Sequence, residues 1–364
     1  MGPATQSLLN PAYPLAPIAR WWGEAGIESE YVEAMRLALA SQEASTSCPV
    51  HGNSALLSLP GLCCEAAGGA RVQRGVENVT AAWCLLYRAA HLFDHIADGD
   101  VAPNAAPAFS PGQSLNIAVG MMTSASLALC ALGENEAAHD IRRDFYRTGL
   151  EMCAGQHAGL TVREPTLAQC WQIAEARSGT FFALACRAGA RLAESHLSRL
   201  VRFGEFGCQL GVLIQIGDDL TGLGPAAGER SDLAAGRRWT LPVAYAMSVM
   251  PGSDRKQLQE LLRAAPGNAD AEAQARRRII ESGAVLYLTI EAERCSRRAE
   301  AALKAAAPPS PAREELLALL QQVLPRVNGE GSSASAPESV CPFHPGGGFL
   351  VPDRLGGLAP GPAP

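Results

Sequence analysis

The sequence predicts an all-α protein whose core forms between packed helices. Hydrophobic residues occupy 48% of the 364 positions but aromatic residues only 5%, so the apolar residues are mostly Ala, Leu and Val. Ala and Leu favour helices strongly. No segment shows the alternation of apolar and polar residues that a half-buried strand needs. These observations indicate one large helical domain rather than a sheet-based fold.

In the N-terminal half, apolar periodicity places the helices one after another. Residues 1–20 carry several prolines and are expected to form an irregular arm. A polar break at residues 43–53 separates the first helix from the second. The helices are predicted at residues 21–42, 54–68, 76–98, 114–132 and 136–158.

The C-terminal half continues the pattern until the composition changes. Gly, Pro and Ser dominate from residue 325 onward, and no periodic apolar face remains, so this tail is expected to be disordered. The expected organisation is an arm at 1–20, a helical domain at 21–324 and a tail at 325–364. The helices of this half are predicted at residues 166–193, 197–222, 240–250, 254–264, 269–304 and 311–324.

The overall composition argues against several classes of protein. A net charge of −6, without a basic face, does not suit a nucleic-acid partner. The eleven cysteines are dispersed and form no CxxC pair, so we interpret them as small buried residues. Neither a signal peptide nor a stable membrane span is expected, which favours a cytoplasmic protein. The CPxH segments at 48–51 and 341–344 fit no standard zinc finger, and coincidence is the favoured interpretation.

Two carboxylates end the apolar run that leads to residue 98. Asp94 and Asp98 are four residues apart, so they share one face of a helix. Burying two such charges is costly unless a cation lies between them. Magnesium prefers carboxylate oxygens together with phosphate and water. The alternative is a helix end that reaches solvent, where acidic side chains are common.

A second acidic pair strengthens the metal interpretation. Asp218 and Asp219 follow the apolar stretch 206–214. Two such helices can face each other across a bundle, which is where helical bundles hold metal ions. We therefore predict that Asp94, Asp98, Asp218 and Asp219 bind magnesium and are the catalytic residues.

This combination suits the ionisation of an allylic diphosphate. Divalent ions and Arg side chains neutralise the charge that develops on the leaving pyrophosphate. The allylic cation that remains needs an apolar pocket that excludes water. Helices rich in Ala, Leu and Phe around two acidic helix ends supply both parts.

Six segments, in order, resemble the trans-isoprenyl diphosphate synthase (polyprenyl synthetase) family, over roughly residues 54–250. His91–Asp98 is similar to the family's first Asp-rich motif, DDxxD, and Gln215–Asp219 to the stretch that contains the second. The others are Gly155-Gln156, Arg177-Ser178-Gly179, Ser231-Asp232-Leu233, and Gly236-Arg237-Arg238 with Thr240-Leu241-Pro242.

The resemblance implies a fold, a cofactor and a set of ligands. It implies a helical bundle of the isoprenoid synthase type with a central active-site cavity, a homodimer, and three Mg²⁺ ions that bind an allylic prenyl diphosphate. The substrate-binding residues that it implies are Gln156, Arg177, Ser178, Gln215, Arg237 and Arg238.

The sequence departs from the family where isopentenyl diphosphate should bind. The family carries Gly-Gly-Lys-Arg-x-Arg-Pro there, but Ser54–Pro60 contains no cation, and residues 99–113 contain no Arg. A diphosphate needs paired cations to be held away from water. In the two metal motifs, His95 replaces the second Asp of the first, and Gly222 replaces the last Asp of the second.

These departures favour ionisation without ordinary elongation. The expected outcome is cyclisation, deprotonation or quenching by water, which is terpene synthase activity on a prenyl synthase scaffold, although the NSE-type motif of standard terpene synthases is absent. The runner-up is a chain-elongating polyprenyl diphosphate synthase, or a prenyltransferase that uses another acceptor. The rival from a different class is a non-catalytic regulatory subunit of a prenyl synthase.

Ala89 and Ala90 are expected to form the floor of the pocket for the prenyl tail. They lie about one turn before Asp94 on the same predicted helix. In the resembling family, bulky aromatic residues at this depth close the pocket after a short chain, and small residues let longer chains pass. Two alanines leave the floor open, unless Leu86, Tyr87 or a neighbouring helix closes it lower down, so the sequence predicts a substrate of fifteen carbons or more.

Overall fold

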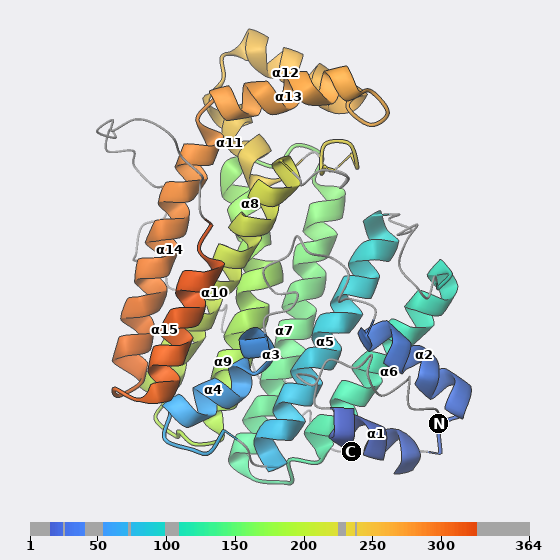
Figure 1. Cartoon of the computed structure of the whole chain (residues 1–364), viewed down its shortest axis with the longest axis vertical. Coiled ribbons are helices and arrows are strands. Elements are labelled where there is room, and N and C mark those ends of the chain that lie inside the picture. The colour runs from blue at the N-terminus through green and yellow to red at the C-terminus, as the bar shows by residue number, and fades with distance from the viewer. Residues whose placement is uncertain are drawn as a thin grey trace, which may run out of the picture. The chain divides into compact units, whose positions relative to one another are not determined.

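The computed structural model describes residues 15–24, 26–40, 54–71, 74–98, 109–224, 231–236 and 239–325, and every regular element in these ranges is a helix (Figure 1). The prediction of an all-α protein is therefore confirmed. The described residues all belong to one compact unit. Nearly all of the expected arm and tail, residues 1–14 and 326–364, lies outside the described residues. None of the described helices is long and apolar enough to cross a membrane.

The chain begins with two helices where one was predicted. Helix α1 spans Leu15–Glu24 and starts inside the stretch expected to be an irregular arm, and α2 spans Ser29–Ala40. Gly26 lies between them with φ of +64°, a left-handed conformation that ends the helix. The α1 helix is fixed to α6 (Pro111–Cys130) by the Trp22 indole, which donates to Ser124 Oγ at 2.8 Å.

The central helices enclose the main hydrophobic core. Here α5 packs along α6, and α10 packs between α9 and α14 (Figure 1). Ser110 with Gln113, and Thr166 with Gln169, form capping boxes that start α6 and α8. The elements are α3 (Ser54–Leu57), α4 (Leu59–Ala66), α5 (Arg74–Asp98), α6 (Pro111–Cys130), α7 (Glu136–Thr161), α8 (Leu167–Ala174), η2 (Glu175–Gly179), α9 (Thr180–Arg191) and α10 (Leu197–Leu223).

The predicted helix at 166–193 is continuous but contains one turn of π-helix, η2. Here the Thr180 amide donates to the Glu175 carbonyl, five residues earlier. Such a turn inserts one residue into an α-helix and is frequent at functional sites. The three residues Arg177, Ser178 and Gly179 lie in this turn.

The C-terminal helices contain a further break that was not predicted. The helix expected at 269–304 is divided at Gly283, whose φ is +84°. A smaller hydrophobic cluster joins α11, α12 and α13 beyond one end of α10 (Figure 1). The elements are α11 (Leu241–Val249), α12 (Gly252–Ala264), α13 (Ala269–Glu281), α14 (Ala284–Ala306) and α15 (Pro311–Val323).

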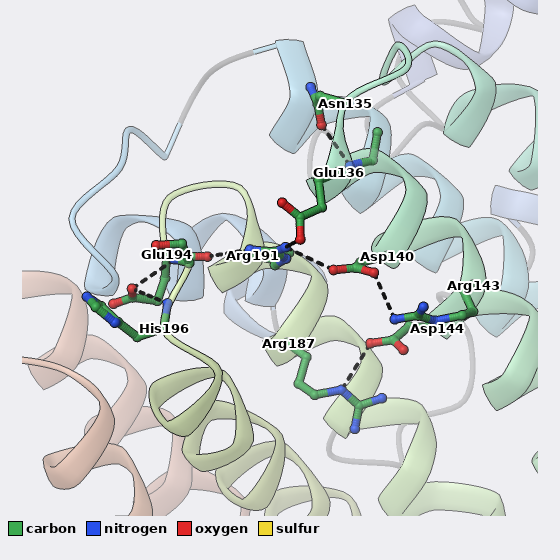
Figure 2. A network of polar contacts seen from close by, with 11 residues as sticks. Asn135, Glu136, Asp140, Arg143, Asp144, Arg187, Arg191, Glu194 and His196 are labelled. Atoms are coloured by element: carbon green, nitrogen blue, oxygen red, sulfur yellow. Dashed lines mark hydrogen bonds and ion pairs between the residues drawn. The ribbon is translucent and has the colours of Figure 1, made fainter.

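A network of acidic and Arg side chains ties α7 to α9 (Figure 2). Arg191 pairs with Asp140 at 2.9 Å, and Arg187 pairs with Asp144 at 3.3 Å. In the turn after α9, the buried Glu194 carboxylate accepts from two backbone amides at 2.8 Å. We interpret this network as structural, because it fixes the end of α9 with paired charges.

Candidate active site

One ion pair connects the first Asp-rich helix to the π-helical turn. The Arg177 guanidinium donates to Asp94 Oδ2 at 2.8 Å, and both side chains are about one-third exposed, at 35% and 32%. Asp94 lies near the end of α5, and Arg177 lies in η2. A carboxylate and an Arg side chain therefore meet at one position that is partly open to solvent.

Hydrogen bonds continue from the same turn to the second Asp-rich helix. Ser178 Oγ donates to Gln215 Oε1 at 2.8 Å, and Gln215 Nε2 donates to Asp219 Oδ1 at 2.8 Å. The Leu241 amide, at the start of α11, donates to Asp219 Oδ2 at 2.7 Å. The structure thus brings Asp94, Arg177, Ser178, Gln215 and Asp219 into one connected set.

A glycine on α10 makes this close approach possible. Any Cβ on Gly211 would overlap the carbonyl oxygen of Ser178 and lie 3.0 Å from the Cα of Gly179. Both neighbours are backbone atoms, so neither can move aside cheaply. Gly211 therefore places the backbone of α10 directly against η2, which puts Gln215, one turn later, within reach of Ser178.

The two carboxylates of the second pair have different surroundings. Asp219 is buried, whereas Asp218 is half buried. The pKa of the Asp219 carboxyl is raised to about 6, mainly by burial and to a smaller extent by the charge of the Asp232 carboxylate. Hydrogen bonds from Leu241 and Gln215 and the charge of Arg177 act in the opposite direction. Asp218 is thus the more accessible carboxylate, and Asp219 is held by protein donors on both oxygens.

The donor set fits magnesium bound jointly with a diphosphate. Within the described ranges, no three His, Cys, Asp or Glu side chains lie close enough together to hold a metal ion by themselves. Magnesium usually takes one or two carboxylates plus phosphate oxygens and water, so Asp94 and Asp218 suit this role. Asp98 is the last residue of α5, and its side chain lies outside the described residues, as do Arg237 and Arg238.

Gln156, which is on α7, lies next to the π-helical turn η2. A Cβ on the preceding residue, Gly155, would lie 2.8 Å from the Ala176 Cβ, so α7 passes close to η2. The Gln156 Oε1 atom is buried and accepts no hydrogen bond from the described residues. An unsatisfied buried acceptor is costly, which makes it a candidate partner for a donor on a ligand or a bound water.

Aromatic side chains lie on α5 in the turns that precede Asp94. Trp83 stacks on Phe181 with ring centroids 4.8 Å apart, and Tyr87 stacks on Phe181 at 5.6 Å. Ala89 is fully buried, and Ala90 is half buried. The two alanines therefore lie between the acidic end of α5 and a packed aromatic cluster.

The segment Ser54–Pro60, which carries none of the family's cations for isopentenyl diphosphate, contributes to the hydrophobic core. Leu56, Leu57 and Leu59 are buried in α3 and at the start of α4. Their burial leaves no polar surface on these three positions for an anion. Most of residues 99–113, the other stretch without Arg, lie outside the described residues.

One donor group of the site and one contact within it could not be found from residue patterns. The Leu241 donor is a backbone amide, and its only signal in the sequence is its place in the Thr240-Leu241-Pro242 segment. The pairing of Asp94 with Arg177 joins residues 83 positions apart. Nothing in either local sequence indicates the other partner.

A family model for polyprenyl synthetase matches residues 73–279. Geranylgeranyl pyrophosphate synthetase from Pyrococcus horikoshii is 18% identical, with a TM-score of 0.70 over 86% of this chain and 99% of that one. A polyprenyl synthetase from Streptomyces coelicolor is 22% identical, with a TM-score of 0.71 over 88% and 97%.

A polyprenyl synthase from Caulobacter crescentus, in complex with calcium and isoprenyl diphosphate, is 22% identical, with a TM-score of 0.67 over 85% and 97%. No curated protein matches the sequence. The structural likenesses show the fold, and it is the isoprenoid synthase bundle that the sequence predicted.

Proposed function

Because this chain belongs to the polyprenyl synthetase family, we propose that it is an enzyme that ionises an allylic prenyl diphosphate and transfers the prenyl group to an acceptor. The observation that carries the proposal is the connected set on α5, η2 and α10, in which Arg177 meets Asp94 and Ser178 leads through Gln215 to Asp219. A diphosphate leaving group needs positive charge beside it. Here Arg177 supplies such charge directly, and the two acidic helix ends would supply it by holding magnesium.

Each residue has a defined role in this proposal. Asp94, Asp98, Asp218 and Asp219 form the metal site, in which Asp94 and Asp218 would hold magnesium and Asp219 orients the end of α10 toward α11. Arg177 binds diphosphate oxygens, with Arg237 and Arg238 as further candidates, and Gln156 offers a polar group beside it. Magnesium, which we expect as three ions, would neutralise the charge that develops on the departing pyrophosphate.

The acceptor decides between two activities. Family membership favours isopentenyl diphosphate as acceptor, and therefore chain elongation, over terpene cyclisation. One observation favours the second candidate, which is ionisation followed by cyclisation, deprotonation or water quenching. Leu56, Leu57 and Leu59 are buried where the resembling family carries its cations for isopentenyl diphosphate. Transfer to a different, less anionic acceptor satisfies both observations.

One experiment separates these activities. Purified protein is incubated with magnesium and allylic diphosphates of ten, fifteen or twenty carbons, with and without labelled isopentenyl diphosphate. Elongation puts the label into longer prenyl diphosphates. Cyclisation or quenching gives a diphosphate-free hydrocarbon or alcohol from the allylic substrate alone. If no allylic substrate releases pyrophosphate but the protein activates a partner synthase, the regulatory-subunit hypothesis replaces both.

We also propose a homodimer in the cytoplasm. Exposed apolar side chains lie on α6 and α7, including Val119 and Leu150, which are 51% and 73% exposed. A second copy packed there would remove this apolar surface from water. The described cysteines are all free thiols, which is usual in a reducing compartment. Sedimentation equilibrium of wild type and Leu150→Glu tests the dimer, since the variant should be monomeric.

A further inference from the structure

The second Asp-rich motif is interrupted at Gly222, but a carboxylate still lies beside that position. A Cβ on Gly222 would overlap Asp232 Oδ2 and lie 2.5 Å from Asp232 Cγ and 3.0 Å from Oδ1. The Asp232 carboxylate therefore occupies the space that a side chain at position 222 would enter. The two residues are also joined through their backbones, since the Asp232 amide donates to the Gly222 carbonyl at 3.0 Å.

Position 222 lies on the same helix face as the other carboxylates of the motif. It follows Asp218 by four residues and Asp219 by three, and residues at these spacings are neighbours on an α-helix. A carboxylate in the side-chain space of residue 222 therefore lies on the helix face that also carries Asp218. Asp232 thus supplies a carboxylate at the helix face where Gly222 stands in place of an acidic residue.

The segment around Asp232 is firmly anchored. Ser231 and Leu233 are buried, each 2% exposed, while Asp232 between them is half buried. Ser231 Oγ donates to Glu272 Oε1 at 2.7 Å and accepts from the Ala234 amide at 3.1 Å. These contacts hold the turn against α13, which keeps the Asp232 carboxylate beside α10.

We propose that Asp232 is a magnesium ligand that replaces the acidic residue missing at position 222. This inference rests on the proposed function, because the metal is the one that Asp218 would share with a diphosphate. Gly222 is then required at its position, since any larger side chain there would push the Asp232 carboxylate away from Asp218.

The test measures metal binding rather than turnover. Mn²⁺ is titrated into protein that contains inorganic pyrophosphate, and free Mn²⁺ is measured by its electron paramagnetic resonance signal. Asp232→Asn should weaken Mn²⁺ binding roughly tenfold or more, as expected when a ligand to the metal is neutralised. Asp270→Asn, at an exposed position of α13, is the matched control and should bind as wild type does.

A positional swap separates ligation from a structural role. The double variant Gly222→Asp with Asp232→Gly moves the carboxylate from the loop to the helix and should restore most of the affinity. A structural role for Asp232 would not be rescued in this way. If Asp232→Asn does not fold, Gly222→Ala decides, because it displaces a flexible carboxylate and adds a residue that favours helix. It should fold and bind Mn²⁺ weakly.

The outcomes distinguish this inference from the proposed function. If wild type binds Mn²⁺ with pyrophosphate and Asp232→Asn or Gly222→Ala binds equally well, the inference is wrong and the proposed function stands. If wild type binds no Mn²⁺ even with pyrophosphate, the metal-dependent function itself is wrong, and the inference fails with it.

Discussion

Arg177 is the residue that links the two acidic helix ends most directly. It binds Asp94 at 2.8 Å while remaining about one-third exposed, so it can exchange a carboxylate oxygen for a diphosphate oxygen. An Arg fork binds phosphate oxygens with two donors, and Lys binds them as a point charge. The resembling family has Lys at this position, which suggests that the positive charge matters more than the fork.

Removing this charge should weaken substrate binding. Arg177→Gln should raise the KM for the allylic diphosphate roughly tenfold to a hundredfold, the range for losing a hydrogen bond to a charged group. Arg177→Lys should recover much of the loss. Steady-state kinetics measure both. Arg143→Gln removes a paired surface Arg on α7 and serves as control. Equal KM values for Arg177→Gln and Arg143→Gln would exclude diphosphate binding by Arg177.

The raised pKa of Asp219 has a consequence for stability. The folded-state pKa is about 6 against an ordinary value of 3.8, so the folded protein binds this proton more tightly than the unfolded chain does. Stability without metal should therefore fall as the pH rises from about 4 through about 6. The effect is on the order of 1–3 kcal/mol at neutral pH.

Asp219→Asn should remove this pH dependence. The Asn oxygen can still accept from the Leu241 amide, and Gln215 can rotate its amide so that Ser178 becomes the acceptor. Melting temperatures of metal-free protein between pH 4.5 and 8 measure the effect. The variant should melt higher than wild type at pH 8, and the difference should shrink toward pH 4.5. Parallel curves for the two proteins would contradict the assigned pKa.

At the scale of the elements, the sequence indicated most helices but not how they are joined. Apolar periodicity locates helices because a buried face repeats every 3.6 residues. The π-helical turn at 175–179 adds one residue, but α9 is buried on nearly all sides, so the resulting shift of the apolar face does not show in the pattern. The breaks at Gly26 and Gly283 depend on a left-handed backbone, which glycines inside other helices, such as Gly149 and Gly211, do not adopt.

The two alanines of α5 set the expected length of the prenyl substrate. Ala90 is half buried between Asp94 and the stacked rings of Trp83 and Tyr87, so the tail should run along this face of the helix. Ala90→Phe should shift preference toward shorter substrates, because overfilling a packed channel costs about 1–3 kcal/mol.

Turnover with ten-, fifteen- and twenty-carbon diphosphates tests this assignment. Wild type should prefer fifteen carbons or more, and Ala90→Phe should lose the longer substrates first. Ala97→Phe, at an exposed position of the same helix beyond Asp94, controls for the added ring. An unchanged profile in Ala90→Phe would show that this face of α5 does not line the tail pocket.

At the scale of the whole molecule, the ordered motifs predicted the fold and named most residues of the candidate site. Arg177, Ser178, Gln215 and both acidic segments were identified because short motifs keep their spacing within one helix. The sequence could not show which of these residues contact one another, because their contacts cross from helix to helix. Nor could it show that Asp232 reaches the space beside Gly222, since a loop of unknown path separates them.

Residue patterns and family membership favour different fates for the prenyl group after pyrophosphate leaves. The missing cations at Ser54–Pro60 favour ionisation alone, and the buried leucines there agree with that interpretation. Membership of the polyprenyl synthetase family favours transfer to a second substrate. Both interpretations share the same first step, in which two acidic helix ends and magnesium release pyrophosphate. That shared step is the central claim.

Pyrophosphate release from a fifteen- or twenty-carbon allylic diphosphate tests this step most directly. With magnesium, wild type should release pyrophosphate, and excess chelator should abolish the release. Asp94→Ala and Asp218→Ala should each reduce it by at least roughly a hundredfold, because each removes charge stabilisation at the leaving group. The exposed control Asp270→Asn should keep the wild-type rate. Full release by wild type in excess chelator, or by Asp218→Ala with magnesium present, would contradict the account.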